Sequence, residues 1–159
     1  GNMRWQKNYG FTVDVFRKYL KKHGDARLLL VGDGPDRENL LSLIGKCGLS
    51  DKVIFTGRVN DVEDYLAAAD VYLMPSNFEG LGIAAIEAQC EGLPCILSVK
   101  VPLSADVTGN CRFLSISAGS ADKWRKAVES AFLTTRCDMS TEIKSAGFSQ
   151  DDVDYKALL

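Results

Sequence analysis

The chain has 159 residues, of which 46% are hydrophobic and 25% charged, and its formal net charge is −2. This length and composition predict one globular domain over residues 1–159 and exclude a disordered or fibrous protein. The slightly negative charge gives no electrostatic footprint for a nucleic-acid partner. No apolar run approaches the ~20 residues of a membrane span, and no signal peptide opens the chain.

The five cysteines and the single histidine limit the chemistry that the chain can perform. The number of cysteines is odd and no CxxC pair exists, so neither a disulfide framework nor a zinc site is predicted. Reduced, buried thiols in a cytoplasmic protein are expected instead. His23 stands at the basic end of a predicted helix, where solvation explains it better than catalysis. Histidine triads and metal sites are therefore not expected.

Short apolar runs alternate with segments of helical period along the chain. The runs lack clean polar alternation, as expected of parallel strands that are covered on both faces. They lie at residues 27–32, 52–57, 70–75, 94–99 and 111–116. Helices are predicted over residues 9–22, from Pro35 to a stop at Gly48, after a cap at Asn60 or Asp61, and after caps at Ser120 and Ser149.

Repeated strand–helix–strand units of this length predict an α/β fold with a doubly wound, Rossmann-like parallel sheet. Ligands bind such sheets at the carboxyl ends of the strands, beside the switch point in strand order. The loops at residues 32–35, 57–60 and 75–82 are therefore the candidate ligand-binding loops. A helix begins almost at once, so the first strand, which belongs in the middle of such a sheet, is expected to be missing.

Residues 31–36 (VGDGPD) join a predicted strand to a helix. Arg37 stands where the third glycine of a dinucleotide fingerprint belongs, so that fingerprint fails. Two interpretations are left open. One is a tight turn with Pro35 as the first helical residue. The other is that Gly32 and Gly34 let a ligand come close to the backbone.

Residues 75–94 (PSNFEGLGIAAIEAQCEGLP) carry two glutamates, Glu79 and Glu87, in a run of glycines and aliphatic residues. Glycines at the start of a helix expose backbone amides at its positive end, which suits a phosphate group. Glu79 would point into the cleft beside this anion, and burying Glu87 without a partner would be costly. Sugar and ribose hydroxyls could satisfy the two carboxylates. The alternative is that Glu79 complements the helix dipole and that Glu87 is solvated or paired with a lysine.

Together, these segments resemble family 4 glycosyltransferases of the GT-B fold. The resemblance includes the proline-serine strand end, the E-x7-E spacing of Glu79 and Glu87, and the following "GLP" turn. The matching segments are Lys7-Asn8 and residues 28–40, 53–76 and 75–98. The similarity covers nearly the whole chain and lies in the C-terminal, donor-binding half of such enzymes. Residues 101–116 look most like bacterial members that build capsular or exopolysaccharide chains.

The resemblance implies a hexosyltransferase that moves a sugar from a UDP- or GDP-linked donor to an acceptor hydroxyl. It also implies retention of anomeric configuration, with no metal or other cofactor. Glu79 would contact the donor sugar, Lys7 would pair with the diphosphate, and Glu87 would accept hydrogen bonds from the ribose. The other donor contacts would come from the amides of Gly80, Leu81, Gly82 and Ile83 and from Arg58 and Val59 at the base.

The resemblance also indicates what this chain lacks. The N-terminal acceptor-binding domain is absent, so the isolated chain is expected to bind donor weakly and to transfer nothing. Asn2 stands where the family usually carries an arginine, and Ser104 where many relatives carry glutamate. A relative that epimerises or hydrolyses sugar nucleotides, and a non-enzymatic Rossmann-like interaction module, stay open as alternatives. The sequence leaves open whether the full-length protein is a peripheral membrane protein.

Overall fold

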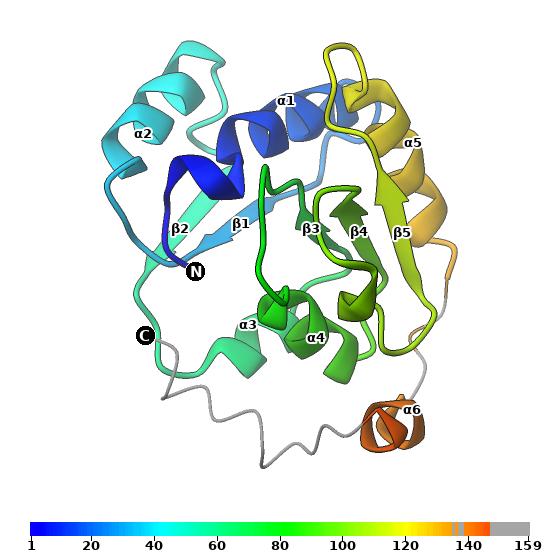
Figure 1. Ribbon diagram of the computed structural model, residues 1–159. Helices are drawn as coiled ribbons and strands as arrows, with labels where there is room; N and C mark the ends of the chain where they lie inside the picture. The colour runs from blue at the N-terminus through cyan, green and yellow to red at the C-terminus, as the bar shows by residue number, and fades with distance from the viewer. Residues whose placement is uncertain (135, 137–138, 147–159) are drawn as a thin grey trace.

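The computed structural model describes residues 1–134, 136 and 139–146. Strands and helices alternate through these residues in the predicted order (Figure 1). The elements are η1 (Trp5–Lys7), α1 (Tyr9–Leu20), β1 (Leu28–Val31), α2 (Arg37–Lys46), β2 (Val53–Gly57), α3 (Val62–Ala67), β3 (Tyr72–Met74), α4 (Ile83–Cys90), β4 (Cys95–Ser98), η2 (Leu103–Ala105), β5 (Cys111–Leu114), α5 (Ala121–Ala131) and α6 (Ser140–Ser145). No helix in this part of the chain is long and apolar enough to cross a membrane.

The strands of the described residues form two parallel sheets. β1 pairs with β2, and β3, β4 and β5 form a second sheet in that order. No ladder joins β1 to β3 in this part of the chain. In a doubly wound sheet of order 3-2-1-4-5-6, the first strand lies between the second and the fourth. The predicted α/β architecture is confirmed, and the described strands divide between β1 and β3.

The first three residues lie along the carboxyl end of β1. The amino group of Gly1 donates to the carbonyl oxygen of Val31 at 2.6 Å. The amide of Met3 donates to the carbonyl oxygen of Asp33 at 2.8 Å, and the Met3 side chain is fully buried. These contacts lead the chain from the edge of β1 into η1, and so they fix the position of Lys7.

Helices cover both faces of the strands. Figure 1 shows α1, α2 and α5 on one side of the strands, and α3 and α4 on the other. All four residues of β4 are buried, because it has a neighbouring strand on each edge and helices on both faces. Alternate β4 residues belong to different core clusters: Cys95 and Leu97 pack with residues of α4, and Ile96 packs with residues of α1 and α5. This two-sided burial explains why the strand sequences lack polar alternation.

The packing of α1 on α5 joins the first part of the chain to the last. Trp124 of α5 is fully buried, and its ring meets Phe11 of α1 edge to face with the ring centroids 5.4 Å apart. Its indole N–H donates to the carbonyl oxygen of Ser115 at 2.8 Å, so no polar group of the side chain is left unsatisfied. This packing holds the two sheets together on one face.

Two helix starts and one whole helix differ from the sequence prediction. α2 begins at Arg37, so Pro35 lies in the preceding turn and is not the first helical residue. Ser120 does precede α5, but its hydroxyl donates to the carbonyl oxygen of Ser117 at 2.7 Å instead of accepting from a helix amide. α6 was not predicted, and the helix predicted after Ser149 lies outside the described residues.

The buried side chain of Gln89 fixes the loop that follows β4. Its amide nitrogen donates to the carbonyl oxygens of Ala85 at 2.9 Å and Ala105 at 2.7 Å. Its amide oxygen accepts from the backbone amides of Val107 and Thr108 and from the Thr108 hydroxyl, at 3.0 to 3.2 Å. Gln89 is only 1% exposed, so it depends on these partners. α4 and the loop therefore form one unit.

Replacing Gln89 by leucine is expected to lower the free energy of unfolding by about 2–3 kcal/mol, because several buried polar groups of the loop lose their partner. Urea denaturation followed by circular dichroism measures the change. Gln6→Leu is the matched control, because the Gln6 side chain is exposed. Equal unfolding midpoints for the two variants would show that the hydrogen bonds of Gln89 do not stabilise the loop after β4.

Candidate functional site

The turn before α4 presents backbone amides without partners. Gly82 precedes the helix in the left-handed conformation, with φ at 76°. Its carbonyl oxygen accepts from the amide of Ala85 at 2.8 Å, and the helix continues from there. No described residue accepts a hydrogen bond from the amides of residues 80–83. Free amides at the positive end of a helix attract anions, and phosphate fits them well.

Gly82 also permits a close approach of the loop that follows β4. A Cβ atom at Gly82 would lie 3.0 Å from the Ala105 Cβ atom and 3.2 Å from a Val101 methyl group. Both of these side chains are buried. Two constraints therefore favour glycine at this position. A side chain would be strained at this positive φ, and its Cβ atom would be crowded by Val101 and Ala105.

Lys7 and Glu79 form an ion pair across 72 residues of sequence. The Lys7 ammonium nitrogen lies 2.8 Å from Oε1 of Glu79, and the Ser76 hydroxyl donates to the same oxygen at 2.6 Å. No described residue donates to Oε2 of Glu79. One carboxylate oxygen is thus held in place, and the other is available to accept a hydrogen bond from a ligand.

Backbone hydrogen bonds hold the two partners of this pair in register. The backbone amide of Asn77 donates to the carbonyl oxygen of Gln6 at 2.7 Å. The Asn77 side chain donates to the carbonyl oxygen of Trp5 at 3.0 Å. In the other direction, the Asn8 side chain donates to the carbonyl oxygen of Pro75 at 3.1 Å. Asn8 has a φ of 53°, a left-handed conformation that asparagine tolerates better than most residues. The ion pair is therefore set by a rigid backbone frame.

Glu87, in α4, is half-buried, and its side chain has no hydrogen bond or ion pair among the described residues. Burial raises the pKa of Glu87 above its ordinary value. The positive charges of the Gly1 amino group and Lys7 oppose this shift, and the carboxylate of Glu63 adds to it. A partly dehydrated carboxylate without a donor is a site where a ligand hydroxyl would gain a strong hydrogen bond.

Two tyrosines, Tyr9 and Tyr72, have pKa values that the nearby glutamates help to raise. Burial, with a smaller contribution from Glu79, raises the pKa of Tyr9 to about 12. Burial also raises the pKa of Tyr72 well above its ordinary value, and Tyr9, Glu87 and Glu79 contribute. Both phenols therefore stay protonated at neutral pH and can donate hydrogen bonds. The structure thus brings Lys7, Glu79 and Glu87 into one electrostatically coupled region.

The glycines after β1 are close to the chain's own backbone. A Cβ atom at Gly32 would overlap the backbone of Gly1, and one at Gly34 would lie 2.5 Å from backbone atoms of Met3. The close approach that these glycines permit is made by residues 1–3, and an approach by a ligand stays a prediction. The two strands also join here, because the Gly32 amide donates to the carbonyl oxygen of Gly57 at 2.9 Å.

Arg58 and Val59 directly follow β2, at the same carboxyl edge as the glycines after β1. Arg58 is exposed and Val59 is partly buried. No hydrogen bond or ion pair of the described residues links Arg58 to the Lys7–Glu79 pair. Arg58 and Val59 therefore lie at the end of β2, whereas Glu79 follows the end of β3. The predicted donor-binding residues are thus divided between two strand ends.

Sequence reasoning missed three of the residues that shape the site. Ser76 bonds to Glu79, while Asn8 and Asn77 tie η1 to the turn after β3. Ser76 lies three residues before Glu79, a spacing that could have suggested the contact. The roles of the two asparagines depend on a backbone conformation and a long-range contact, and no local pattern indicates them.

The fold and the cluster at the strand ends are those of a Rossmann-like α/β domain. The model of the family Glycosyl transferases group 1 matches residues 1–148, so the chain belongs to this family. Among curated relatives, it is 38% identical over 95 residues to N-acetyl-alpha-D-glucosaminyl L-malate synthase of Bacillus anthracis, covering 60% of this chain and 25% of that protein. It is 34% identical over 101 residues to the putative glycosyltransferase EpsF of Bacillus subtilis, covering 63% and 26%. The chain thus spans about a quarter of these relatives.

Solved structures agree on the fold. The chain is similar to the pneumococcal O-GlcNAc transferase GtfA, crystallised with UDP and GlcNAc, with a TM-score of 0.72 and 19% identity over 92% of this chain and 31% of that one. The similarity to Anabaena HepE, crystallised with UDP, has a TM-score of 0.72 and 19% identity over 92% and 41%. Both similarities identify the fold of the domain.

Gly82→Ala is expected to lower the free energy of unfolding by about 1–2 kcal/mol, because a side chain is strained at positive φ. Its close contacts with Val101 and Ala105 would add to this cost. Gly80→Ala is the matched control, since a Cβ atom there meets nothing within 4 Å and the φ is not positive. Urea denaturation of both variants tests the difference. A tolerated Gly82→Ala would show that the loop after β4 does not press on the helix start.

Glu87→Gln is expected to raise stability at neutral pH. The pKa of Glu87 is raised in the folded state, so the folded protein favours the protonated carboxyl. The contribution of Glu87 to the free energy of unfolding is therefore complete at a pH below the pKa of this carboxyl in the unfolded chain. It is lost as the pH rises through the higher pKa of the same carboxyl in the folded protein. Urea denaturation at about pH 7 should show a more stable variant, and at about pH 3 the gain should vanish. Glu38→Gln, at a side chain that is 85% exposed, is the control. A variant less stable at pH 7 would contradict the prediction.

Proposed function

We propose that this chain is the donor-binding part of a glycosyltransferase that moves a sugar from a nucleoside diphosphate sugar to an acceptor hydroxyl. Membership in the family Glycosyl transferases group 1 supports a transferase, and gives no support to an epimerase or to an interaction module. The observation that carries the proposal is the free amide run of residues 80–83, with Lys7, Glu79 and Glu87 around it.

The diphosphate of the donor would lie against these amides. Lys7 would add a positive charge to the same place, and the amides and Lys7 together would stabilise the charge that develops on the departing nucleoside diphosphate. Lys7 is paired with Glu79 at 2.8 Å, so its ammonium group is already held near the helix start. Its side chain is 29% exposed, which leaves it accessible to an anion.

Glu79 would orient the donor sugar. Its Oε1 atom is held by Lys7 and Ser76, so its Oε2 atom is presented in a fixed direction as a hydroxyl acceptor. Glu79 has an exposed side-chain fraction of 12%, and a hydrogen bond from the sugar would be formed in a partly dry environment, where it is stronger than in water.

Glu87 would accept hydrogen bonds from the ribose of the same donor. Its side chain has no partner among the described residues, and burial raises its pKa. Ribose hydroxyls would supply the missing donors and favour the ionised carboxylate. Arg58 and Val59 would line the base, with the turn at Gly32 and Gly34 beside them at the same strand edge.

The intact enzyme, on this proposal, retains the anomeric configuration and needs no metal. Its acceptor hydroxyl would be positioned by an additional N-terminal domain, so this chain alone would transfer no sugar, because catalysis depends on that positioning. Bacterial relatives named for lipopolysaccharide core or O-antigen biosynthesis, such as LpsE of Rhizobium meliloti and WclY of Escherichia coli, support a role in polysaccharide biosynthesis. We place this role in the cytoplasm. The UDP in similar crystal structures makes UDP the first nucleotide to test, with GDP as the alternative.

Isothermal titration of the chain with UDP, and separately with GDP, tests the donor site. One of the two is expected to bind, and Lys7→Met should weaken binding of that diphosphate by about tenfold, because one charge-assisted contact is lost. Binding of the corresponding nucleoside should change little. Glu87→Ala should weaken the diphosphate similarly, but it should leave the affinity of the 2′,3′-dideoxy analogue unchanged, because that analogue has no hydroxyls to offer.

Two results would contradict the proposal. The first is that neither nucleotide binds. The second is that the dideoxy analogue loses as much affinity as the natural nucleotide on Glu87→Ala, since Glu87 would then act on the fold and not on the ribose. Glu38→Gln serves as the control variant, because that side chain is exposed on α2.

A further inference from the structure

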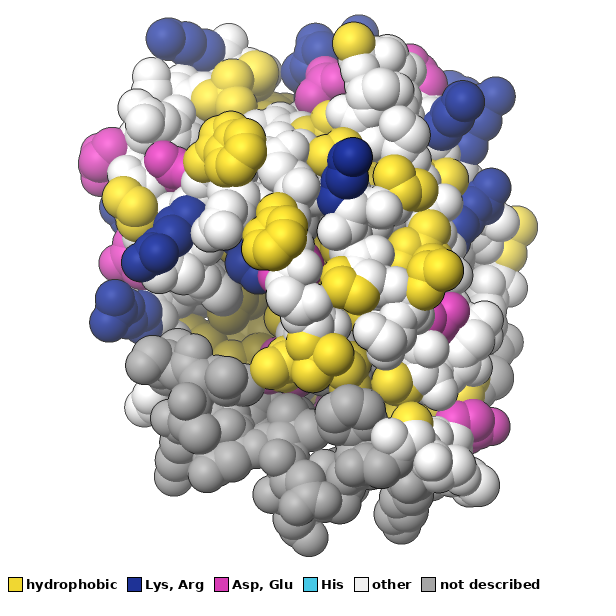
Figure 2. Space-filling view, in the orientation of Figure 1, with side chains coloured by type: hydrophobic (Ala, Val, Ile, Leu, Met, Phe, Trp, Pro, Cys, Tyr) yellow, Lys and Arg dark blue, Asp and Glu magenta, His cyan; other side chains and the backbone are white. Residues whose placement is uncertain are grey.

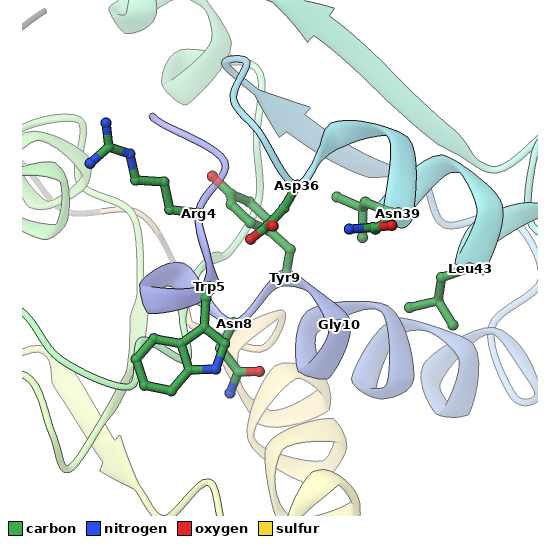
Figure 3. Close-up of a pocket in the computed structure, with 9 residues that line it drawn as sticks. Arg4, Trp5, Asn8, Tyr9, Gly10, Asp36, Asn39 and Leu43 are labelled. Atoms are coloured by element: carbon green, nitrogen blue, oxygen red, sulfur yellow. The ribbon is translucent and has the colours of Figure 1, made fainter.

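A pocket of about 210 Å³ lies between η1, the start of α1 and the start of α2 (Figure 3). Trp5 stands at one rim and Leu43 at the other, with Gly10 between them, while Asp36 and Asn39 reach in from the α2 side (Figure 3). We call it the Trp5 pocket. Pockets for drug-sized ligands hold ~300–1,000 Å³, so this one has room for a single ring.

Most polar side chains of this pocket have no partner among the described residues; Asn8, which donates to Pro75, is the exception. Arg4, Asp36 and Asn39 line it, and none of their side chains forms a hydrogen bond or ion pair among the described residues. Tyr9 also lines it, and its phenol stays protonated at neutral pH because burial raises its pKa to about 12. A guanidinium, a carboxylate, an amide and a phenol together offer donors and acceptors for several hydroxyl groups.

Trp5 gives the same pocket an apolar platform. Its side chain is 73% exposed, whereas Trp124, the other tryptophan, is fully buried. Two further hydrophobic side chains are exposed on the neighbouring turn after β3, Phe78 at 62% and Leu81 at 45%. Figure 2 shows exposed hydrophobic side chains across the middle of the face seen in Figure 1. An exposed aromatic ring next to unengaged polar groups is a pattern that suits a ligand with both apolar and hydroxylated faces.

The pocket lies on the edge of the fold where the donor site lies. Asp36 belongs to the turn that follows β1, and the donor site follows β3, so both are at carboxyl ends of parallel strands. The carbonyl oxygen of Trp5 accepts from the Asn77 side chain at 3.0 Å, and Asn8, which lines the pocket, donates to Pro75 at 3.1 Å. The pocket and the Lys7–Glu79 pair are therefore held by one backbone frame.

We propose that the Trp5 pocket binds one sugar ring of a saccharide acceptor, with the ring stacked on the indole and its hydroxyls bonded to Asp36 and Asn39. This inference rests on the proposed function, since the acceptor of the transfer would be a saccharide. A pyranose has an apolar C–H face and a rim of hydroxyls, which match the indole and the polar side chains respectively. Part of the acceptor is thus bound by the donor-binding half of the enzyme.

Gly10 provides a way to block the pocket without disturbing the fold. It lies in the first turn of α1, and a Cβ atom there would meet only a Leu43 methyl group at 3.9 Å, an ordinary contact. Its φ is not positive, so a side chain brings no backbone strain. Gly10→Leu should fill the pocket and Gly10→Ala should leave most of it open. Both replace a helix glycine by a better helix former.

Iodide quenching of tryptophan fluorescence is the test, because iodide reaches the exposed Trp5 and not the buried Trp124. The chain is titrated with glucose, galactose, N-acetylglucosamine and cellobiose, and with sorbitol as an acyclic control. At least one saccharide is expected to protect Trp5 from iodide in the original chain and in Gly10→Ala, and sorbitol is not. Gly10→Leu should abolish the protection and keep the nucleotide affinity measured by calorimetry.

Calorimetry on Trp5 variants gives a second readout. Trp5→Phe keeps an aromatic face and should keep saccharide binding, while Trp5→Ala should weaken it by about tenfold. The proposal is overturned if no saccharide protects Trp5, or if protection persists in Gly10→Leu. It is also overturned if UDP or GDP protects Trp5 and competes with the saccharide, because the pocket would then belong to the donor. Nucleotide binding without saccharide protection would sink only this inference, and absence of nucleotide binding would sink the proposed function.

Discussion

The ion pair between Lys7 and Glu79 joins two parts of a chain whose described strands form two separate sheets. On the face covered by α1 and α5, apolar packing around Trp124 holds these parts together. At the carboxyl edge, the link is polar: the ion pair and the hydrogen bonds of Asn8 and Asn77. A partly exposed ion pair contributes little to stability, roughly 0–1 kcal/mol. Its consequence is positional, because it sets where a cation and a carboxylate stand relative to the start of α4.

This arrangement also explains how the carboxyl edge of the strands can hold the ammonium group of Lys7 together with the carboxylates of Glu79 and Glu87. Glu79 has its positive partner in place, whereas Glu87 has none in the part of the chain that the structure describes, and burial raises the pKa of Glu87. The free amides of residues 80–83 lie in the chain between the two carboxylates and favour an anion. A ligand that brings a negative centre flanked by hydroxyl groups would satisfy all three features at once. A nucleoside diphosphate sugar has this order of groups: hydroxylated sugar, diphosphate, hydroxylated ribose.

The alternation of strands and helices could be predicted from sequence, because each strand is a compact apolar run and each helix has a 3.6-residue period. The helix ends were less predictable. Pro35 is a favourable first helical residue, yet the turn after β1 extends to Asp36 because its backbone bonds to Met3. Serine is a common N-cap residue, but the hydroxyl of Ser120 donates to the carbonyl oxygen of Ser117 instead of accepting from a helix amide. In both cases a specific contact outweighs a local preference.

The site was predicted in its parts but not in its connections. The spacing of Glu79 and Glu87 and the glycines before α4 are local patterns, and the sequence displays them. The pairing of Lys7 with Glu79 spans 72 residues and depends on how the two sheets sit together, so no local pattern contains it. The close packing of residues 1–3 on Gly32 and Gly34 is a similar case, because the glycines indicate a close approach without indicating what approaches.

The short helix η1 contributes residues to both proposed sites. In a 3₁₀-helix of three residues per turn, side chains two positions apart point in different directions. Lys7 accordingly contacts Glu79, while Trp5 lines the pocket beside α2. Hydrogen bonds at Trp5 and at Asn8, which follows η1, tie the backbone on both sides of Lys7 to the segment after β3. Transfer between two bound substrates requires that their reacting groups be held in a productive geometry. Of the described elements, η1 is one that contacts both sites, and this is the structural reason to look for the acceptor next to it.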